Sequence, residues 1–156
     1  MFETAELGRQ IPAKDFKRAV APLRRELLQL QDELRMLKRT QMIVLFEGVD
    51  GAGKRETVNL LNAWMDPRWL VIRAFERPTE DERQHPAYWR YWRSLPGRGR
   101  IGLFLSAWYS APLLDRVYDR CSRPDFDSRL DRTLAFETAL ADDGAAIVKF
   151  WMHLSH

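Results

Sequence analysis

The most regular hydrophobic pattern of the chain lies between residues 13 and 39, where apolar residues recur at alternating spacings of four and three. Such a repeat is typical of a helix with an apolar seam along one side. The seam consists of Phe16, Val20, Leu23, Leu27, Leu30, Leu34 and Leu37. Pro22 falls within the repeat and is expected to bend the helix or to mark its start. The pattern is compatible with a helix lying on its own domain, or with a helix hairpin or dimer contact.

Beyond residue 40, short apolar runs alternate with helical patterns. The predicted strands are 42–46, 69–75, 101–105 and 145–152. The predicted helices are 55–65, 88–93, 112–120 and 130–141. This alternation predicts an α/β fold with a doubly wound parallel sheet, whose ligands bind beyond the carboxyl ends of the strands. We expect an N-terminal helical extension over residues 1–40 and an α/β domain over residues 41–156.

A glycine-rich motif joins the first predicted strand to the next predicted helix. It reads Gly48-x-x-x-x-Gly53-Lys54. In the P-loop motif, such a turn directs backbone N–H groups toward phosphate at the positive end of a helix, and the lysine adds charge for the outer phosphates. The domain is therefore predicted to be P-loop kinase-like. The predicted phosphate-binding residues are Gly48, Asp50, Gly51, Ala52, Gly53, Lys54 and Arg55.

Metal binding is less well supported by the same loop. The strict motif places Ser or Thr after the lysine to hold Mg²⁺, but this chain has Arg55. Asp50 is the candidate metal ligand, directly or through water, and otherwise caps the loop. Asp50 and Lys54 are also the candidate catalytic residues. The histidines His85, His153 and His156 have no metal-ligand spacing and are expected to be structural.

Arginine is concentrated between residues 68 and 100, a stretch that contains eight arginines and four acidic residues. Because Arg suits bidentate phosphate contacts, this stretch is a candidate track for a polyanion, with a solvated surface as the alternative. No nucleic-acid-binding module is present, so nucleic acid is not expected. The aromatic rings of segment 88–93 are expected to pack in the core, with base stacking as the alternative. Asp115 and Arg116 are expected to pair with each other or to line the cleft.

Length and composition suit one soluble domain: 156 residues, 46% apolar and 30% charged. No apolar run approaches the ~20 residues needed to span a bilayer, and the first residues lack the pattern of a signal peptide. Cys121 is the only cysteine, which excludes an internal disulfide. We therefore expect a cytoplasmic protein that does not bind a membrane.

Seven stretches stand in one order along the chain: 46–54, 66–68, 78–83, 88–93, 95–96, 106–109 and 149–155. Together they resemble the family-2 polyphosphate kinases. The first eight residues resemble the start of two-domain polyphosphate:AMP phosphotransferases, so the chain resembles an N-terminal unit. The resemblance implies transfer of a phosphoryl group from inorganic polyphosphate to AMP or ADP, with Mg²⁺. It also implies a second kinase unit as a partner.

The chain departs from that family where the resemblance places the chemistry. After the third predicted strand the family has an Asp–Arg pair for metal and phosphate, but this chain has Leu105 and Ser106. The usual Gly-Gly after the loop lysine is Arg55-Glu56, and the chain would stop before the lid helix. Leu cannot bind Mg²⁺, and phosphoryl transfer requires positive charge around the transferring group. We expect a degenerate phosphate-binding unit that is inactive alone and whose binding of Mg²⁺ is in doubt.

Two other functions are compatible with these residues. One is an active P-loop kinase for a small acceptor, such as a thymidylate kinase. Residues 46–54 of this chain fit the phosphate loop of that family well. The long segment before the loop, Arg55 and the missing Asp–Arg pair argue against it. The other is an interaction module that works through the heptad helix. Binding of polyphosphate distinguishes this module from the phosphate-binding unit, and turnover distinguishes the active kinase.

Overall fold

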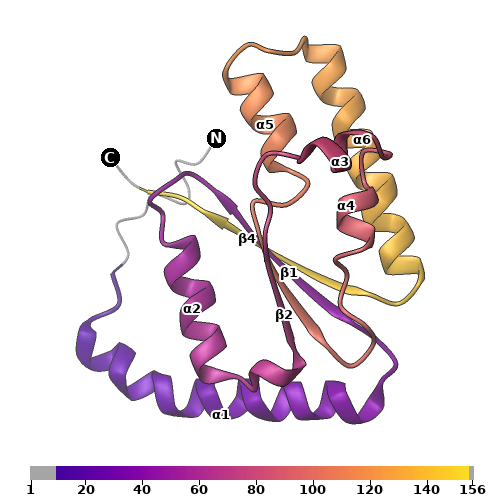
Figure 1. Ribbon diagram of the computed structural model, residues 1–156. Coiled ribbons are helices and arrows are strands. Elements are labelled where there is room, and N and C mark those ends of the chain that lie inside the picture. Colours follow the sequence, from indigo (N-terminus) through magenta and orange to yellow (C-terminus); the bar gives the residue numbers. More distant parts are fainter. Residues whose placement is uncertain (1–9, 155–156) are drawn as a thin grey trace.

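The computed structural model describes residues 10–154, and Figure 1 shows strands alternating with helices along the chain. The strands are β1 (Met42–Gly48), β2 (Leu70–Ala74), β3 (Ile101–Leu105) and β4 (Ala146–Met152). The helices are α1 (Ala13–Leu37), α2 (Lys54–Trp64), α3 (Glu80–Arg83), α4 (Trp89–Trp92), α5 (Ser110–Val117) and α6 (Arg123–Asp142), with a 3₁₀ turn η1 (Pro67–Trp69). The four strands lie at their predicted places. His156 and the first nine residues lie outside the described part.

The described strands form one parallel sheet in the order β2-β3-β1-β4. β1 is central: Met42 is paired with Ile101 of β3 on one side and with Ala146 of β4 on the other. Helices α1 and α2 cover one face of the sheet, and α4 and α6 cover the other (Figure 1). This arrangement confirms the predicted α/β fold with a doubly wound parallel sheet.

The core consists of two apolar layers, one on each face of the sheet. Val44 and Phe46 of β1 pack toward Val58 of α2. Ile43 and Leu45 of the same strand point the other way, into a layer built largely of aromatic rings. That layer contains Tyr91, Phe104, Trp108, Phe136 and Leu140. Because successive side chains of a strand alternate between faces, residues 42–46 of β1 must be apolar to serve both layers.

Two helices differ from their predicted bounds by several residues, and α5 (Ser110–Val117) begins and ends slightly before the predicted 112–120. Helix α6 begins at Arg123, well before the predicted start at residue 130. The hydroxyl of Ser122 accepts a hydrogen bond from the N–H of Asp125, and Pro124 occupies the first turn; both are start signals that a search for apolar periodicity misses. The predicted helix 88–93 is reduced to the four residues of α4.

No helix within residues 10–154 combines the length and hydrophobicity needed to cross a membrane.

Helix α1 runs along the base of the domain, across the end of α2 (Figure 1). Its seam is divided: Leu27 and Leu34 pack on the core, whereas Phe16, Leu23, Leu30 and Leu37 are 46–64% exposed. Gln31 fastens the helix, since its amide donates to the Asp66 carbonyl at 3.0 Å and accepts from the Asp66 N–H at 2.8 Å. The helix thus lies on its own domain, and self-association through the exposed half of the seam stays a prediction. Pro22 lies inside the helix and does not mark its start.

Candidate phosphate-binding site

The phosphate loop, residues 48–55, connects the end of β1 to the first turn of α2 at the carboxyl edge of the sheet (Figure 1). Gly48, Gly51 and Gly53 have φ values of 114°, 81° and 84°. Gly53 directly precedes α2, so the unpaired N–H groups of that helix's first turn open onto the loop. The structure therefore brings the predicted phosphate-binding residues together in one turn whose geometry suits an anion.

Lys54 folds back over this loop. Its Nζ donates to the Gly48 carbonyl at 2.5 Å and to the Val49 carbonyl at 3.1 Å, and its side chain is only 12% exposed. A third contact, to Asp50 Oδ1, is longer at 3.4 Å. The ammonium group is thus held close to the loop backbone, where it can compensate the charge of a phosphate bound by the N–H groups.

Among the described residues, the loop offers few carboxylates to a metal ion. The Asp50 side chain is fully exposed, and within residues 10–154 its one ion pair is with Lys54. Within the described residues, no group of three or more His, Cys, Asp or Glu side chains is placed to hold a metal ion. Leu105, at the end of β3, packs against the apolar core on the α2 side of the sheet. Mg²⁺ is usually held by one or two carboxylates together with water and substrate phosphates, so Asp50 could supply at most one of its oxygen ligands.

Leu105 and Ser106 lie beside the phosphate loop. The sheet register pairs Leu105 with Phe46 of β1, two residues before Gly48. The N–H of Ser106 donates to the Phe46 carbonyl at 3.2 Å, and Ser106 has a φ of 52°. The departures found in the sequence therefore fall next to the loop, and an isobutyl group and a hydroxyl provide no charge there.

A buried carboxylate that sequence analysis did not identify joins the phosphate loop to the segment after β3. Glu47 directly precedes Gly48 and is 2% exposed. Its Oε1 accepts the N–H of Ala107 at 2.7 Å, and its Oε2 accepts the hydroxyl of Ser110 at 2.6 Å. Burial raises the pKa of Glu47, while the two hydrogen bonds and the charge of Lys54 act in the opposite direction. The available signal was an acidic residue at the end of an otherwise apolar strand.

A second buried carboxylate, Glu137 of α6, anchors β4 and α5. Its oxygens accept from Lys149 Nζ at 2.5 Å, Trp108 Nε1 at 2.9 Å and Tyr109 Oη at 3.0 Å. Lys149 also donates to Tyr109 Oη at 2.8 Å. Despite the desolvation of its ammonium group, these partners raise the pKa of Lys149. The contacts link residues far apart in sequence, which is why the spacing of motifs did not reveal them.

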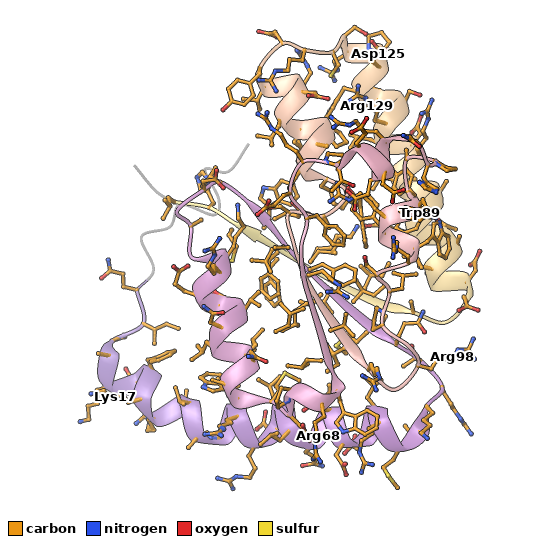
Figure 2. The ribbon with its side chains drawn as sticks, in the orientation of Figure 1. Lys17, Arg68, Trp89, Arg98, Asp125 and Arg129 are labelled. Carbon is orange, nitrogen blue, oxygen red and sulfur yellow. The ribbon has the colours of Figure 1, made fainter. Side chains whose placement is uncertain are left out.

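The arginine-rich stretch does not form one track. Arg68 and Arg98 lie in segments that precede β2 and β3, at the end of the sheet opposite the phosphate loop (Figures 1 and 2). Arg68 pairs with Asp66 at 2.6 Å, and Arg98 pairs with Asp143 at 3.2 Å. Arg90 is largely buried and packs over Phe75. Three arginines of this stretch, Arg73, Arg77 and Arg83, have exposed side chains. Among the described residues, these side chains make no hydrogen bond, ion pair or ring contact.

The aromatic segment 88–93 packs in the core only in part, because Trp92 is 49% exposed. Tyr91 is buried, and the Tyr88 hydroxyl lies 2.8 Å from Thr133 Oγ1. The ring of Trp89 stacks on His85 in this region (Figure 2). The expected pairing of Asp115 with Arg116 is wrong. Asp115 binds Arg129 of α6 at 2.6 Å, and Arg116 binds Asp119 at 3.0 Å, because adjacent residues of a helix point in different directions.

A parallel α/β sheet with a glycine loop and a lysine at the start of the following helix is the arrangement of the P-loop kinase-like fold. Over residues 10–156 the chain matches the model of polyphosphate kinase 2 (PPK2), and it belongs to that family. It is 45% identical over 99% of its length to a polyphosphate:AMP phosphotransferase of Pseudomonas aeruginosa. It is 35% identical over 83% of its length to a GDP-polyphosphate phosphotransferase of Mycobacterium tuberculosis.

Solved structures agree with this assignment. A crystal structure of a polyphosphate kinase 2 from Pseudomonas aeruginosa superposes with a TM-score of 0.95 at 45% identity, over 99% of this chain and 34% of that one. Polyphosphate kinase 2 from Arthrobacter aurescens superposes with a TM-score of 0.87 at 26% identity, over 96% of this chain and 54% of that one. The resemblance found in the sequence is thereby confirmed, and it excludes membership of the thymidylate kinases. The chain spans 31% of the length of the Pseudomonas phosphotransferase.

Proposed function

We propose that this chain is the phosphate-binding unit of a polyphosphate-dependent nucleotide phosphotransferase and that it does not transfer phosphoryl groups by itself. The observation that carries the proposal is the contrast between two neighbouring positions. Lys54 Nζ lies 2.5 Å from the Gly48 carbonyl oxygen of the loop, where it can bind an anion. The neighbouring end of β3 carries the apolar Leu105. One half of a phosphoryl-transfer site is present and the other half is absent.

Binding at the loop follows from its own groups. A bound phosphate accepts hydrogen bonds from the N–H groups at the start of α2, and the ammonium of Lys54 neutralises part of its charge. Lys54 then exchanges its contacts with the Gly48 and Val49 carbonyls for contacts with phosphate oxygens. The exposed Arg55 adds a further positive charge in the first turn of α2. These contacts are electrostatic, so a chain of phosphates binds better than a single one.

Transfer requires more than binding. The transition state of phosphoryl transfer is stabilised by metal ions and by cationic side chains around the transferred group. Asp50 and Lys54 are the remaining candidates for such a role, and Asp50 alone does not complete a Mg²⁺ site. By relation to the phosphotransferases of the family, the polyanion bound by this unit is polyphosphate, and the acceptor of the complete enzyme is AMP or ADP. We assign catalysis to a second kinase unit and place the protein in the cytoplasm, where nucleotides are found.

A calorimetric titration with tripolyphosphate and with long-chain polyphosphate tests the proposal. Lys54→Ala should weaken binding by roughly 1–3 kcal/mol, the contribution of a charge-assisted hydrogen bond. Lys17→Ala is the matched control, because it removes the same charge from the exposed side of α1, far from the loop (Figure 2). Equal affinity of the Lys54→Ala and Lys17→Ala proteins would contradict binding at the loop.

The dependence on salt gives a second readout. Release of counterions from a long polyanion makes the affinity fall steeply as salt increases, and we extend this behaviour of nucleic acids to polyphosphate. Binding of orthophosphate, which carries few counterions, should change much less. An affinity for long-chain polyphosphate that stays constant between low and high salt would contradict the proposed binding mode.

A further inference from the structure

Helix α1 carries a line of large apolar side chains that its own domain leaves half uncovered. The line, which we call the outer stripe, consists of Phe16, Leu23, Leu30 and Leu37, which are 46%, 46%, 47% and 64% exposed. Its members are seven residues apart, which is close to two helical turns, so they lie along one side of the helix. The neighbouring line of α1, which contains Leu27 and Leu34, packs on the core.

The spacing of the outer stripe is the same in both directions along the helix. Its members are arranged evenly about a midpoint between residues 26 and 27. A second copy of α1 that runs antiparallel therefore brings Leu23 of each copy opposite Leu30 of the other, and Phe16 opposite Leu37. A twofold axis through the midpoint generates this arrangement, so each contact occurs twice. A line with a spacing of seven residues also suits the small crossing angle at which long helices pack along one another.

The charges of α1 favour the antiparallel direction. Residues 13–25 contain five basic side chains and one acidic side chain, a net charge of +4, whereas residues 26–37 contain three acidic and one basic, a net charge of −2. An antiparallel pair places the basic half of each helix beside the acidic half of the other, whereas a parallel pair would bring the two basic halves together. We propose that the protein forms a twofold dimer through the outer stripe, with the two α1 helices antiparallel and Leu23 of each copy against Leu30 of the other.

The position of α1 in the fold suits this contact. Gln31 and Leu34 are 3% and 9% exposed, so the helix is already fastened to its domain through a different side. Dimerisation therefore does not have to order the helix, which lowers the entropic cost of association. The helix lies along the base of the domain, whereas the phosphate loop lies at the opposite end of the sheet (Figure 1). Both phosphate loops thus stay accessible in the dimer.

The interface is small, because each copy contributes one line of four half-exposed residues. Small interfaces between preformed surfaces give weak association, so we expect a dissociation constant of roughly 1–100 µM. Sedimentation equilibrium over a range of protein concentrations measures this constant. The apparent mass should rise from that of the monomer toward twice that value, without larger species, because a twofold contact closes on itself.

Two substitutions on the same helix test whether the outer stripe forms the contact. Leu23→Glu places a carboxylate against Leu30 of the other copy, twice in each dimer. Because an unpaired charge is unfavourable in an apolar contact, the dissociation constant should rise at least roughly a hundredfold. Met36→Glu is the matched control, since Met36 is 67% exposed but lies about 100° around the helix from Leu37. Its dissociation constant should change by about threefold or less.

Cysteine cross-linking tests the direction and register of the pair. In a Cys121→Ser background, the Leu23→Cys and Leu30→Cys proteins are oxidised with glutathione disulfide, each alone and as a mixture. The mixture should give a disulfide-linked dimer that contains one copy of each variant. Either protein alone should not, because identical positions are offset by seven residues, roughly 10 Å along the pair, which is too far for a disulfide.

Three results would overturn the proposal. Cross-linking of each variant with itself would indicate a parallel pair. Equal dissociation constants for Leu23→Glu and Met36→Glu would place the contact on another surface. A protein that stays monomeric at about 1 mM would assign the outer stripe to a different partner. If Leu23→Glu does not fold, the cross-linking of the two cysteine variants decides the question. These readouts do not depend on phosphate binding.

Discussion

The carbonyl oxygen of Met152 occupies the space in which a side chain on Gly48 would have to lie: a Cβ built on Gly48 falls 1.9 Å from that oxygen. The same carbonyl accepts the N–H of Val49 at 3.2 Å. The end of β4 is thus packed against the first residue of the phosphate loop. The loop therefore depends on the position of β4 as well as on its own glycines, and a change at either element should affect the other.

Gly48→Ala should destabilise the fold more than an ordinary loop substitution. A φ of 114° is unfavourable for alanine, and the added methyl group must displace backbone atoms of β4. Together the two effects should cost about 3 kcal/mol or more in the free energy of unfolding, measured by urea denaturation. Gly53→Ala is the control: its φ of 84° carries similar strain, but no atom lies within 4 Å of its Cβ. A loss in the free energy of unfolding no larger than that of Gly53→Ala would show that β4 can shift to accommodate the added methyl group.

Glu47 predicts a dependence of stability on pH. Burial raises its pKa above the ordinary value of 4.5, so between 4.5 and the raised value the folded state binds more protons at this site than the unfolded state. Linkage then requires that this contribution to the free energy of unfolding decrease as the pH rises through that window and remain low above it. The amide introduced by Glu47→Gln cannot titrate, so the stability of the unsubstituted protein relative to that variant should fall as the pH rises above 4.5.

The measurement is urea unfolding of the unsubstituted protein and of Glu47→Gln at several pH values. Taking the difference between the two proteins cancels the titration of every group that they share. Glu56→Gln is a suitable control, because it makes the same carboxylate-to-amide change at an exposed position on α2. A stability difference for Glu47→Gln that is constant or increases with pH would contradict the raised pKa.

The parts of the fold that follow from local pattern were predictable from the sequence. The strands lie where the apolar runs predict them, and the phosphate loop lies where the glycine spacing predicts it. For β1 the reason is that its side chains serve two core layers and must therefore be apolar. What could not be predicted depends on distant contacts. Glu137 meets Lys149 only because α6 and β4 pack together, and Arg68 is separated from the phosphate loop by the length of the sheet. The start of α6 was missed because its first turn is polar.

The attachment of α1 provides a prediction that is independent of the phosphate loop. Gln31 is 3% exposed and makes two hydrogen bonds to the backbone of Asp66. Gln31→Ala leaves that N–H and that carbonyl without these partners and should cost about 1–3 kcal/mol in the free energy of unfolding. Gln29→Ala, on the same helix, removes only an exposed contact with Glu33 and should change stability by about 0.5 kcal/mol or less. Equal effects would indicate that water replaces the Gln31 amide.

Phosphoryl transfer by the isolated chain should be very slow. Leu105 supplies no metal ligand, Ser106 supplies no positive charge, and the loop carries Arg55 in place of a small residue. In related phosphoryl transfers, loss of one cationic residue at the transition state alone costs ~10³-fold or more. The losses should compound, although not additively. The assay combines purified protein, Mg²⁺, polyphosphate and AMP or ADP and follows formation of ADP or ATP, with the Pseudomonas aeruginosa polyphosphate:AMP phosphotransferase as the positive control.

Restoring the missing groups tests the reason for this inactivity. Leu105→Asp with Ser106→Arg supplies a carboxylate and a guanidinium beside the loop, and any gain in turnover should require both substitutions. The gain should be small, because Leu105 belongs to the apolar core and Ser106 has a φ of 52°, which is unfavourable for arginine by roughly 1–2 kcal/mol. Turnover by the unsubstituted chain near 1 s⁻¹, within the ordinary range of kinases, would contradict the proposal. Asp50 would then be the first candidate for the metal ligand, and loss of that turnover in Asp50→Asn would identify it.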